Sequence, residues 1–196
     1  MNTAVLLERI RESSPGIKAR VAGLFYLLTF LAGGITVVFF RHGLAVYGVA
    51  ANIIENAFHI VVTLLFYDLF KPVNKSLSLF AACLSLVGCA VEILSHFHYV
   101  PSHISSMAFF GFYCLLIGFL IFRSTFLPRI LGVLMAIAGL CWLTFLSTPL
   151  VNYLSPYNIA FGALGEGSLM LWFLVFGVNT GRWKAQAGAA GTSVRT

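Results

Sequence analysis

Three glutamates lie inside segments that otherwise consist largely of apolar residues: Glu55, Glu92 and Glu166. A charged side chain at the centre of a bilayer costs about 2.5–3.5 kcal/mol on insertion scales, so such residues are rare and commonly face a protein interior or a water-filled cavity. The chain has only six acidic residues, and half of them are in these segments. We therefore expect the chemistry of this protein to centre on the three glutamates.

The rest of the composition is that of an integral membrane protein. The 196 residues are 60% hydrophobic and 9% charged, whereas a soluble domain carries about 25% charged residues. Six apolar segments have the length of roughly 20 residues that a helix needs to cross a bilayer: 21–40, 45–70, 76–98, 104–122, 128–146 and 157–178. The sequence thus predicts an all-α integral membrane bundle of six transmembrane helices.

Lys and Arg are distributed unevenly over the two ends of this predicted bundle. Eleven of them lie on the side of both termini, and only Arg41 lies on the other side. Basic loops stay in the cytoplasm, so both termini are predicted to be cytoplasmic. The net charge of +6 then fits contact with anionic lipid headgroups, and nucleic-acid binding is not expected because no soluble basic module is present.

The domain organisation follows from the same pattern. We expect residues 1–17 to form a cytoplasmic or interfacial N-terminal segment, residues 18–182 the six-helix domain, and residues 183–196 a flexible cytoplasmic tail of small and polar residues. Connections between the apolar segments are short, which predicts antiparallel neighbours. No second domain is indicated.

Small residues inside the predicted helices point to close packing. Gly111 and Gly118 are seven residues apart, as are Gly132 and Gly139, and small residues on one face let helices approach closely in lipid. The four cysteines all fall inside helices and are expected to be packing residues without disulfides. Trp142 is expected to be a core or lipid-facing residue.

Several stretches resemble a known bacterial family. They are Ala19–Gly33 (ARVAGLFYLLTFLAG), Lys71–Lys75 (KPVNK), Phe122–Gly132 (FRSTFLPRILG), and Gly165-Glu166 followed by Leu171-Trp172. Over most of residues 18–180 the chain resembles the six-helix bacterial membrane family catalogued as domain of unknown function four-three-eight-six. The resemblance implies the bundle fold and a place in the bacterial inner (cytoplasmic) membrane. It supplies no reaction, because the family has no agreed catalytic signature.

The second predicted helix carries a continuous polar face. Its members, spaced three, one, three and four residues apart, are Asn52, Glu55, Asn56, His59 and Thr63. At about 100° per residue these positions share one side of a helix. Polar groups inside a membrane face the bundle interior or a wet cavity rather than lipid. We therefore expect this face to point inward.

The third predicted helix repeats the arrangement. Its polar face consists of Ser78, Ser85, Cys89, Glu92 and His96, and His98 and His103 follow its end. At a rise of about 1.5 Å per residue, Glu55, Glu92 and Glu166 lie about 9–13 Å from the outer ends of their helices. The sequence therefore predicts a polar cavity in the outer half of the bilayer, between the second, third and sixth helices. Asn52, Asn56, Thr63, Ser85 and Cys89 are its expected lining residues.

The charge in this predicted cavity leaves three alternatives open. No Lys or Arg lies near it, and burial among like charges disfavours the ionised form of a carboxylate. A divalent metal such as zinc or iron would balance the charge, with Glu55, Glu92, His59, His96, His98 and His103 as candidate ligands. Alternatively, Glu55, Glu92 and Glu166 hold protons and act as acid/base groups. In the third alternative the polar groups only join helices.

These alternatives lead to different functions. Metal-assisted or acid/base chemistry on an apolar substrate, for example a lipid-like or isoprenoid molecule, is the first active role that we expect. A small proton-coupled carrier is a second. A membrane scaffold or accessory subunit, with its own partner subunits, is the alternative without chemistry. The sequence leaves open whether the protein is an enzyme.

Overall fold

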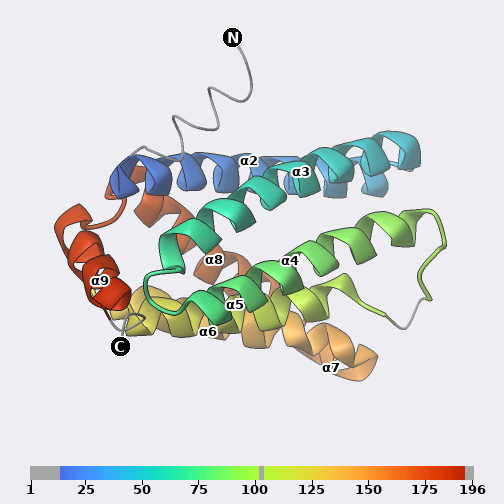
Figure 1. Cartoon of the computed structure of the whole chain (residues 1–196). Helices are drawn as coiled ribbons and strands as arrows, with labels where there is room; N and C mark the ends of the chain where they lie inside the picture. The colour runs from blue at the N-terminus through green and yellow to red at the C-terminus, as the bar shows by residue number, and fades with distance from the viewer. Residues whose placement is uncertain (1–13, 102–103, 193–196) are drawn as a thin grey trace, which may run out of the picture.

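The computed structural model describes residues 14–101 and 104–192, and it contains six helices that are long and apolar enough to cross a membrane (Figure 1). They are α2 (Pro15–Arg41), α3 (Ala45–Phe70), α4 (Lys75–His96), α5 (Ser106–Arg123), α6 (Arg129–Leu143) and α8 (Tyr157–Val175). A short 3-10 turn, η1 (Thr144–Leu146), extends α6. The predicted all-α bundle of six membrane-spanning helices is confirmed, with end positions shifted by a few residues.

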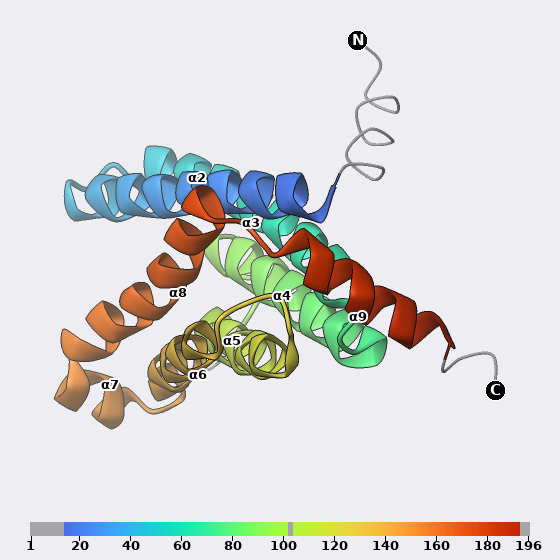
Figure 2. The same ribbon diagram turned by 90° about the vertical axis from the view of Figure 1, so that its left-hand side faces the viewer.

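The six long helices form a closed ring in chain order. Each long helix packs against the next one, and α8 packs back against α2. In Figure 2, α2 and α3 lie on one side of the molecule, α5 and α6 lie on the opposite side, and α8 and α4 lie between them. A side chain that points into this ring is shielded from lipid, which is what a polar group inside a membrane requires.

Glycines set the close contact between α5 and α6. A Cβ atom on Gly132 would lie 2.7 Å from the carbonyl oxygen of Gly118, and a Cβ atom on Gly139 would lie 2.7 Å from the carbonyl oxygen of Gly111. Any larger side chain at these positions would therefore collide with the backbone of the facing helix. The packing role predicted for these four glycines is what the structure shows.

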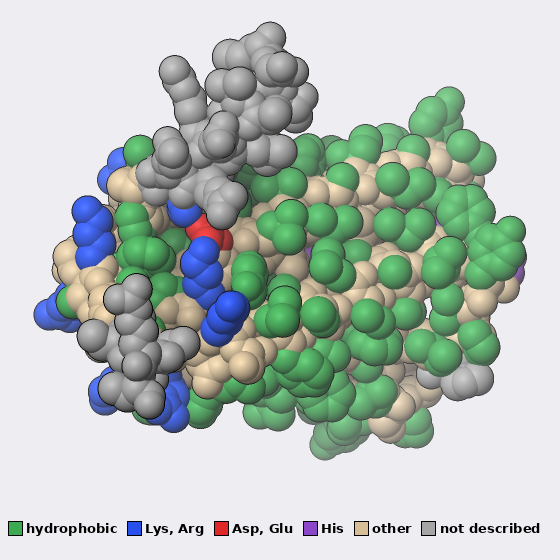
Figure 3. All heavy atoms as spheres, viewed as in Figure 1, with side chains coloured by type: hydrophobic (Ala, Val, Ile, Leu, Met, Phe, Trp, Pro, Cys, Tyr) green, Lys and Arg blue, Asp and Glu red, His purple; other side chains and the backbone are tan. Residues whose placement is uncertain are grey.

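One end of the ring collects nearly all the basic residues, and we call it the basic end. It is formed by the start of α2, the turn between α3 and α4, the turn between α5 and α6, and the segment after α8. Its described Lys and Arg residues are Lys18, Arg20, Lys71, Lys75, Arg123, Arg129, Arg182 and Lys184. Figure 3 shows them gathered at one end of an otherwise apolar surface. Asp68 pairs there with both Lys18 and Lys71.

Two shorter helices lie near the ends of the ring. Helix α7 (Thr148–Leu154) precedes α8, and α9 (Thr180–Thr192) follows it. Where we expected a flexible tail from residue 183, α9 is held to the basic end. The Trp183 indole donates to the carbonyl oxygen of Leu69 at 2.8 Å, and the Gln186 side chain accepts two hydrogen bonds from Thr125 at 3.0 Å.

Aromatic side chains fill the interior next to the basic end. The ring of Phe66 lies 5.9 Å from Phe70 and 5.4 Å from Phe173, and Phe70 lies 6.0 Å from Phe126, measured between ring centroids. We call these four residues the aromatic plug. All four are buried, so packed side chains fill the interior at this end.

The glycine contact gives a direct test of the α5–α6 packing. We expect Gly132→Ala to lower the free energy of unfolding by about 1–3 kcal/mol, because overpacked cores lose stability in this range. Gly167→Ala is the matched control, since a Cβ atom on Gly167 would meet no atom within 4 Å. Both variants are measured by denaturant unfolding in detergent. Equal stability of the two would contradict the packing role.

Candidate functional site

A cavity of about 430 Å³ lies inside the ring, in the half away from the basic end. All six long helices contribute side chains to it. The three glutamates Glu55, Glu92 and Glu166 all line this one cavity, together with His59 and Asn56. The sequence predicted walls from α3, α4 and α8 only. The structure adds α2, α5 and α6.

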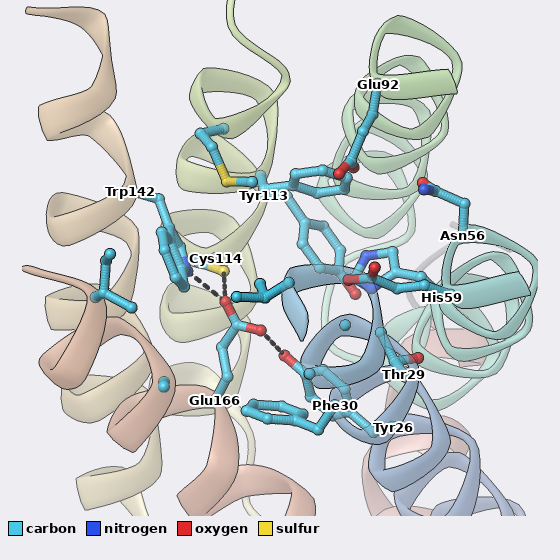
Figure 4. Close-up of a pocket in the computed structure, with 18 residues that line it drawn as sticks. Tyr26, Thr29, Phe30, Asn56, His59, Glu92, Tyr113, Cys114, Trp142 and Glu166 are labelled. Atoms are coloured by element: carbon cyan, nitrogen blue, oxygen red, sulfur yellow. Dashed lines mark hydrogen bonds between the residues drawn. The ribbon is translucent and has the colours of Figure 1, made fainter. Parts of the chain in front are cut away.

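Glu166 occupies one part of the cavity and is held by three donors from three other helices. The hydroxyl of Tyr26 on α2 donates to its Oε2 at 2.6 Å, and the thiol of Cys114 on α5 donates to its Oε1 at 3.5 Å. The indole Nε1 of Trp142 on α6 donates to the same Oε1. Figure 4 shows the three side chains converging on the carboxyl group. Glu166 therefore joins four of the six helices.

Glycine creates the space for the Trp142 ring. A Cβ atom on Gly162 would lie 2.8 Å from the indole, so a larger residue one turn before Glu166 on α8 would displace the ring from its carboxyl partner. The sequence expectation that Trp142 is only a core or lipid-facing residue is incomplete, because its Nε1 donates to a cavity carboxyl group.

Glu55 and Glu92 form a second polar group, which we call the Glu55–Glu92 pair. The side-chain amide of Asn52 donates to both, at 3.3 Å to Oε2 of Glu55 and at 3.1 Å to Oε1 of Glu92. Thr36 on α2 also donates to Glu55, at 3.3 Å. A Cβ atom on Gly33 would lie 2.8 Å from Oε1 of Glu55, so glycine at this position leaves room for the carboxyl group.

His59 lies among aromatic rings and bonds across to α4. Its Nε2 lies 3.1 Å from the hydroxyl of Ser85, which lies 2.7 Å from the hydroxyl of Thr63. The imidazole also packs against Phe110 at 5.1 Å and Tyr113 at 5.9 Å between centroids. Its side-chain hydrogen bond thus goes to Ser85 on α4 and not to Glu55, one turn earlier on α3.

The hydroxyl of Tyr113 stands out among the lining groups. The residue is 2% exposed, and among the described residues its hydroxyl is the one buried side-chain oxygen or nitrogen without a hydrogen-bond partner. A buried polar group without a partner costs about 1–3 kcal/mol. The neighbouring hydroxyl of Thr63 is already bonded to Ser85, so the Tyr113 hydroxyl is free to bond a polar atom inside the cavity.

The charge in the cavity is one-sided. Its described lining residues include three carboxyl groups and neither Lys nor Arg. Most of the wall is apolar or aromatic, with Tyr26, Phe30, Phe110, Tyr113 and Trp142 as its aromatic members. In such surroundings several ionised carboxylates would repel one another without compensation. The arrangement can therefore hold protons or bind a positively charged or hydrogen-bonding molecule.

The other described histidines do not line the cavity. His96 bonds the side-chain oxygen of Asn52 at 3.1 Å and stacks on Phe40. His98 is exposed and adopts a left-handed backbone (φ 59°) where the chain turns after α4. His103 lies outside the described residues. Within residues 14–101 and 104–192, no three His, Cys, Asp or Glu side chains are grouped so that they could hold a metal ion.

The other predicted lining residues take several positions. Asn56 lines the cavity. Asn52, Thr63 and Ser85 do not line it but take part in the hydrogen bonds described above. Cys89 is buried. The sequence reading missed α2, although its positions Tyr26, Thr29, Gly33 and Thr36 follow spacings of three, four and three residues. This periodic stripe of hydroxyl-bearing and small residues could have predicted that α2 contributes to the cavity wall.

Comparisons with known proteins bear on the fold more than on the reaction. A family model described as Domain of unknown function (DUF4386) matches residues 95–177. An uncharacterized protein of Archaeoglobus fulgidus is 28% identical over 127 residues, which cover 60% of this chain and 76% of that protein. No solved structure matches the chain. Over residues 95–177, which include Cys114, Trp142 and Glu166, the resemblance found in the sequence is thus confirmed as similarity to the DUF4386 family.

Proposed function

We propose that this protein binds a small, largely apolar molecule from the membrane in its central cavity and that binding is linked to protonation, as in a small proton-coupled carrier. One observation carries the proposal. A single cavity combines three carboxyl groups with an aromatic wall and has no Lys or Arg among its described lining residues.

The size and lining of the cavity support ligand binding. Binding sites for small molecules have volumes of about 300–1,000 Å³ and are largely apolar with a few converging polar groups. The cavity of about 430 Å³ has this character. Its walls come from all six long helices, so a bound molecule would contact side chains from every one of them.

The carboxyl groups supply the link to protons. A neutral apolar ligand removes water from the cavity, and loss of water disfavours the ionised form of a carboxylate. Such a ligand therefore binds better when the glutamates are protonated. By linkage, its binding takes up protons, and its affinity falls as the pH rises.

The proposed orientation rests on the basic residues. Lys and Arg stay on the cytoplasmic side of membrane proteins, so we place the basic end and both termini in the cytoplasm of a bacterial cell, with the protein in the inner membrane. The cavity then lies in the outer half of the bilayer. The aromatic plug would separate it from the cytoplasm.

Two other functions use the same groups. Acid/base catalysis on a lipid-like or isoprenoid substrate would use the glutamates as proton donors and acceptors. A metal-assisted form would need a zinc or iron ion held by Glu55, Glu92 and the histidines. Both stay predictions from the sequence. The scaffold alternative is favoured by the hydrogen bonds themselves. Thr36–Glu55, Asn52–Glu92 and Tyr26–Glu166 each join two helices, and such bonds stabilise helix association.

Filling the cavity tests ligand binding. We expect wild-type protein in nanodiscs to bind 1-naphthalenemethanol saturably, more tightly at pH 5 than at pH 8. Gly34→Leu should weaken binding at least about tenfold, because Gly34 lines the cavity with open space around it and the larger side chain occupies part of the volume. Gly167→Leu, on α8 outside the cavity lining, is the matched control. Fluorescence titration against empty nanodiscs measures both. If neither this probe nor its trimethylammonium counterpart binds saturably to the wild type, the proposal is refuted and the scaffold role is left.

Removing the acceptor at Glu166 tests its contribution to stability. Glu166→Leu leaves the Tyr26 hydroxyl and the Trp142 indole without their partner, so we expect a loss of about 2–4 kcal/mol in the free energy of unfolding. Glu166→Gln keeps an acceptor oxygen and should lose less than half as much. Denaturant unfolding in detergent compares the two, and equal losses would contradict the role of the hydrogen bonds.

Labelling of single cysteines tests the orientation. Tyr153 is 84% exposed at the end opposite the basic end, and Lys75 is exposed at the basic end. In intact cells with a permeable outer membrane, a membrane-impermeant maleimide should label Tyr153→Cys, whereas Lys75→Cys should react only after the inner membrane is opened. The wild type provides the background from the four native cysteines. The reverse pattern would place the cavity on the cytoplasmic side.

A further inference from the structure

The inference below rests on the proposed function and names the class of its ligand. We infer that the cavity takes a small organic cation with an apolar body, such as a quaternary ammonium compound, and that its positive group sits at the Glu55–Glu92 pair while its apolar body lies against the aromatic wall.

The hydrogen bonds distinguish the two parts of the cavity. At Glu166, both oxygens already accept bonds from protein donors, since Tyr26 reaches Oε2 while Trp142 and Cys114 reach Oε1. This carboxyl group is therefore satisfied without a ligand. The Glu55–Glu92 pair is held differently. One amide, that of Asn52, is divided between the two carboxyl groups at 3.3 and 3.1 Å. The Thr36 hydroxyl donates in addition to Glu55 at 3.3 Å, so the two acids are held by neutral donors and share one of them.

A cation is the group that this pair lacks. Two carboxylates that share a site repel each other unless one is protonated or a positive charge lies between them. No Lys or Arg is among the described lining residues. His96 lies near Glu92, but its hydrogen bond goes to the side-chain oxygen of Asn52. A ligand that brings its own positive charge would relieve the repulsion while both acids are ionised.

The wall suits the rest of such a ligand. Tyr26, Phe30, Phe110, Tyr113 and Trp142 line the same cavity. Aromatic faces attract ammonium groups through their ring quadrupoles, and cages of aromatic residues are a common way to bind quaternary ammonium ligands. In Figure 4, Glu92 and Asn56 lie at one side of the cavity, Glu166 and Trp142 lie at the other, and Tyr113 lies between them.

The unpaired hydroxyl of Tyr113 is an independent sign of a ligand. It is buried and lines the cavity without a hydrogen-bond partner among the described residues. Because Tyr113 lies between Glu92 and Glu166 in Figure 4, its hydroxyl would meet a polar atom on the body of the bound molecule. We therefore expect ligands that also carry a hydroxyl or ether oxygen to bind more tightly than purely hydrocarbon cations.

Proton balance follows from the charges. The titratable groups that surround the Glu55–Glu92 pair are His59 on the same helix as Glu55, Cys89 and His96 on α4, Tyr113 and Cys114 on α5, Tyr26 on α2 and Glu166 on α8. When the cation enters, one carboxylic acid of the pair becomes a carboxylate, its O–H bond breaks, and the proton leaves to water. Cation binding therefore releases protons and strengthens as the pH rises, which is the opposite of the behaviour of a neutral ligand.

The experiment compares three probes with one ring system. (1-Naphthylmethyl)trimethylammonium cannot lose its charge, 1-(2,2-dimethylpropyl)naphthalene has carbon in place of the charged nitrogen, and 1-naphthalenemethanol is the neutral probe used above. In nanodiscs at pH 8 we expect the cation to bind at least about tenfold more tightly than its carbon analogue. Its affinity should rise up to about tenfold per pH unit while one proton is released for each cation bound.

Variants assign the site of the cation. Glu55→Gln combined with Glu92→Gln should remove the preference for the cation and the proton release while binding of 1-naphthalenemethanol persists, which also shows that the variant is folded. Gly167→Leu is the control that should match the wild type. Binding of the neutral probe without any preference for the cation would overturn this inference and leave the proposed function intact. Binding of none of the three would refute both.

Discussion

Every carboxyl group inside this bundle needs a partner that the bilayer cannot provide, and the arrangement of the six helices meets that constraint. Each of the three carboxyl groups accepts a hydrogen bond from another helix: from Tyr26, Cys114 and Trp142 at Glu166, from Thr36 at Glu55 and from Asn52 at Glu92. In hydrocarbon a polar group without a partner costs several kcal/mol. The packing of the six helices in a ring brings these donors within hydrogen-bond distance of the carboxyl groups.

The sequence predicted the elements well and the contacts poorly. Hydropathy and length were sufficient to predict six helices. The helical periodicity of 3.6 residues was sufficient to predict that Glu55 and Glu92 face inward on α3 and α4. It did not reveal that Asn52 lies between them, because that depends on how α3 and α4 are rotated against each other. Tyr26 and Glu166 are 140 residues apart, and no local pattern relates them. The hydrogen bond of Trp142 to Glu166 was missed for the same reason, since nothing in the local sequence indicates a partner for its indole nitrogen.

The histidines show a different limit of sequence reasoning. Four of the five lie on α3 and α4 or shortly after, and their number suggested metal ligands. In the fold His59 bonds a serine, His96 bonds an asparagine and His98 forms the turn after α4. Spacing along a helix shows which residues share a face, but it does not show which atom each side chain reaches. The carboxyl groups, not the histidines, are what the cavity brings together.

The contact between α8 and α2 has a consequence for how the protein assembles. A ring built in chain order has its first and last members in contact, so the enclosed space exists only once the sixth helix has entered the membrane. Until then Tyr26 has no carboxyl partner, and the polar faces of α3 and α4 have no wall in front of them. The hydrogen bond between Tyr26 and Glu166 thus joins the first and last of the six long helices, and the wall of the cavity is complete only when both are in place.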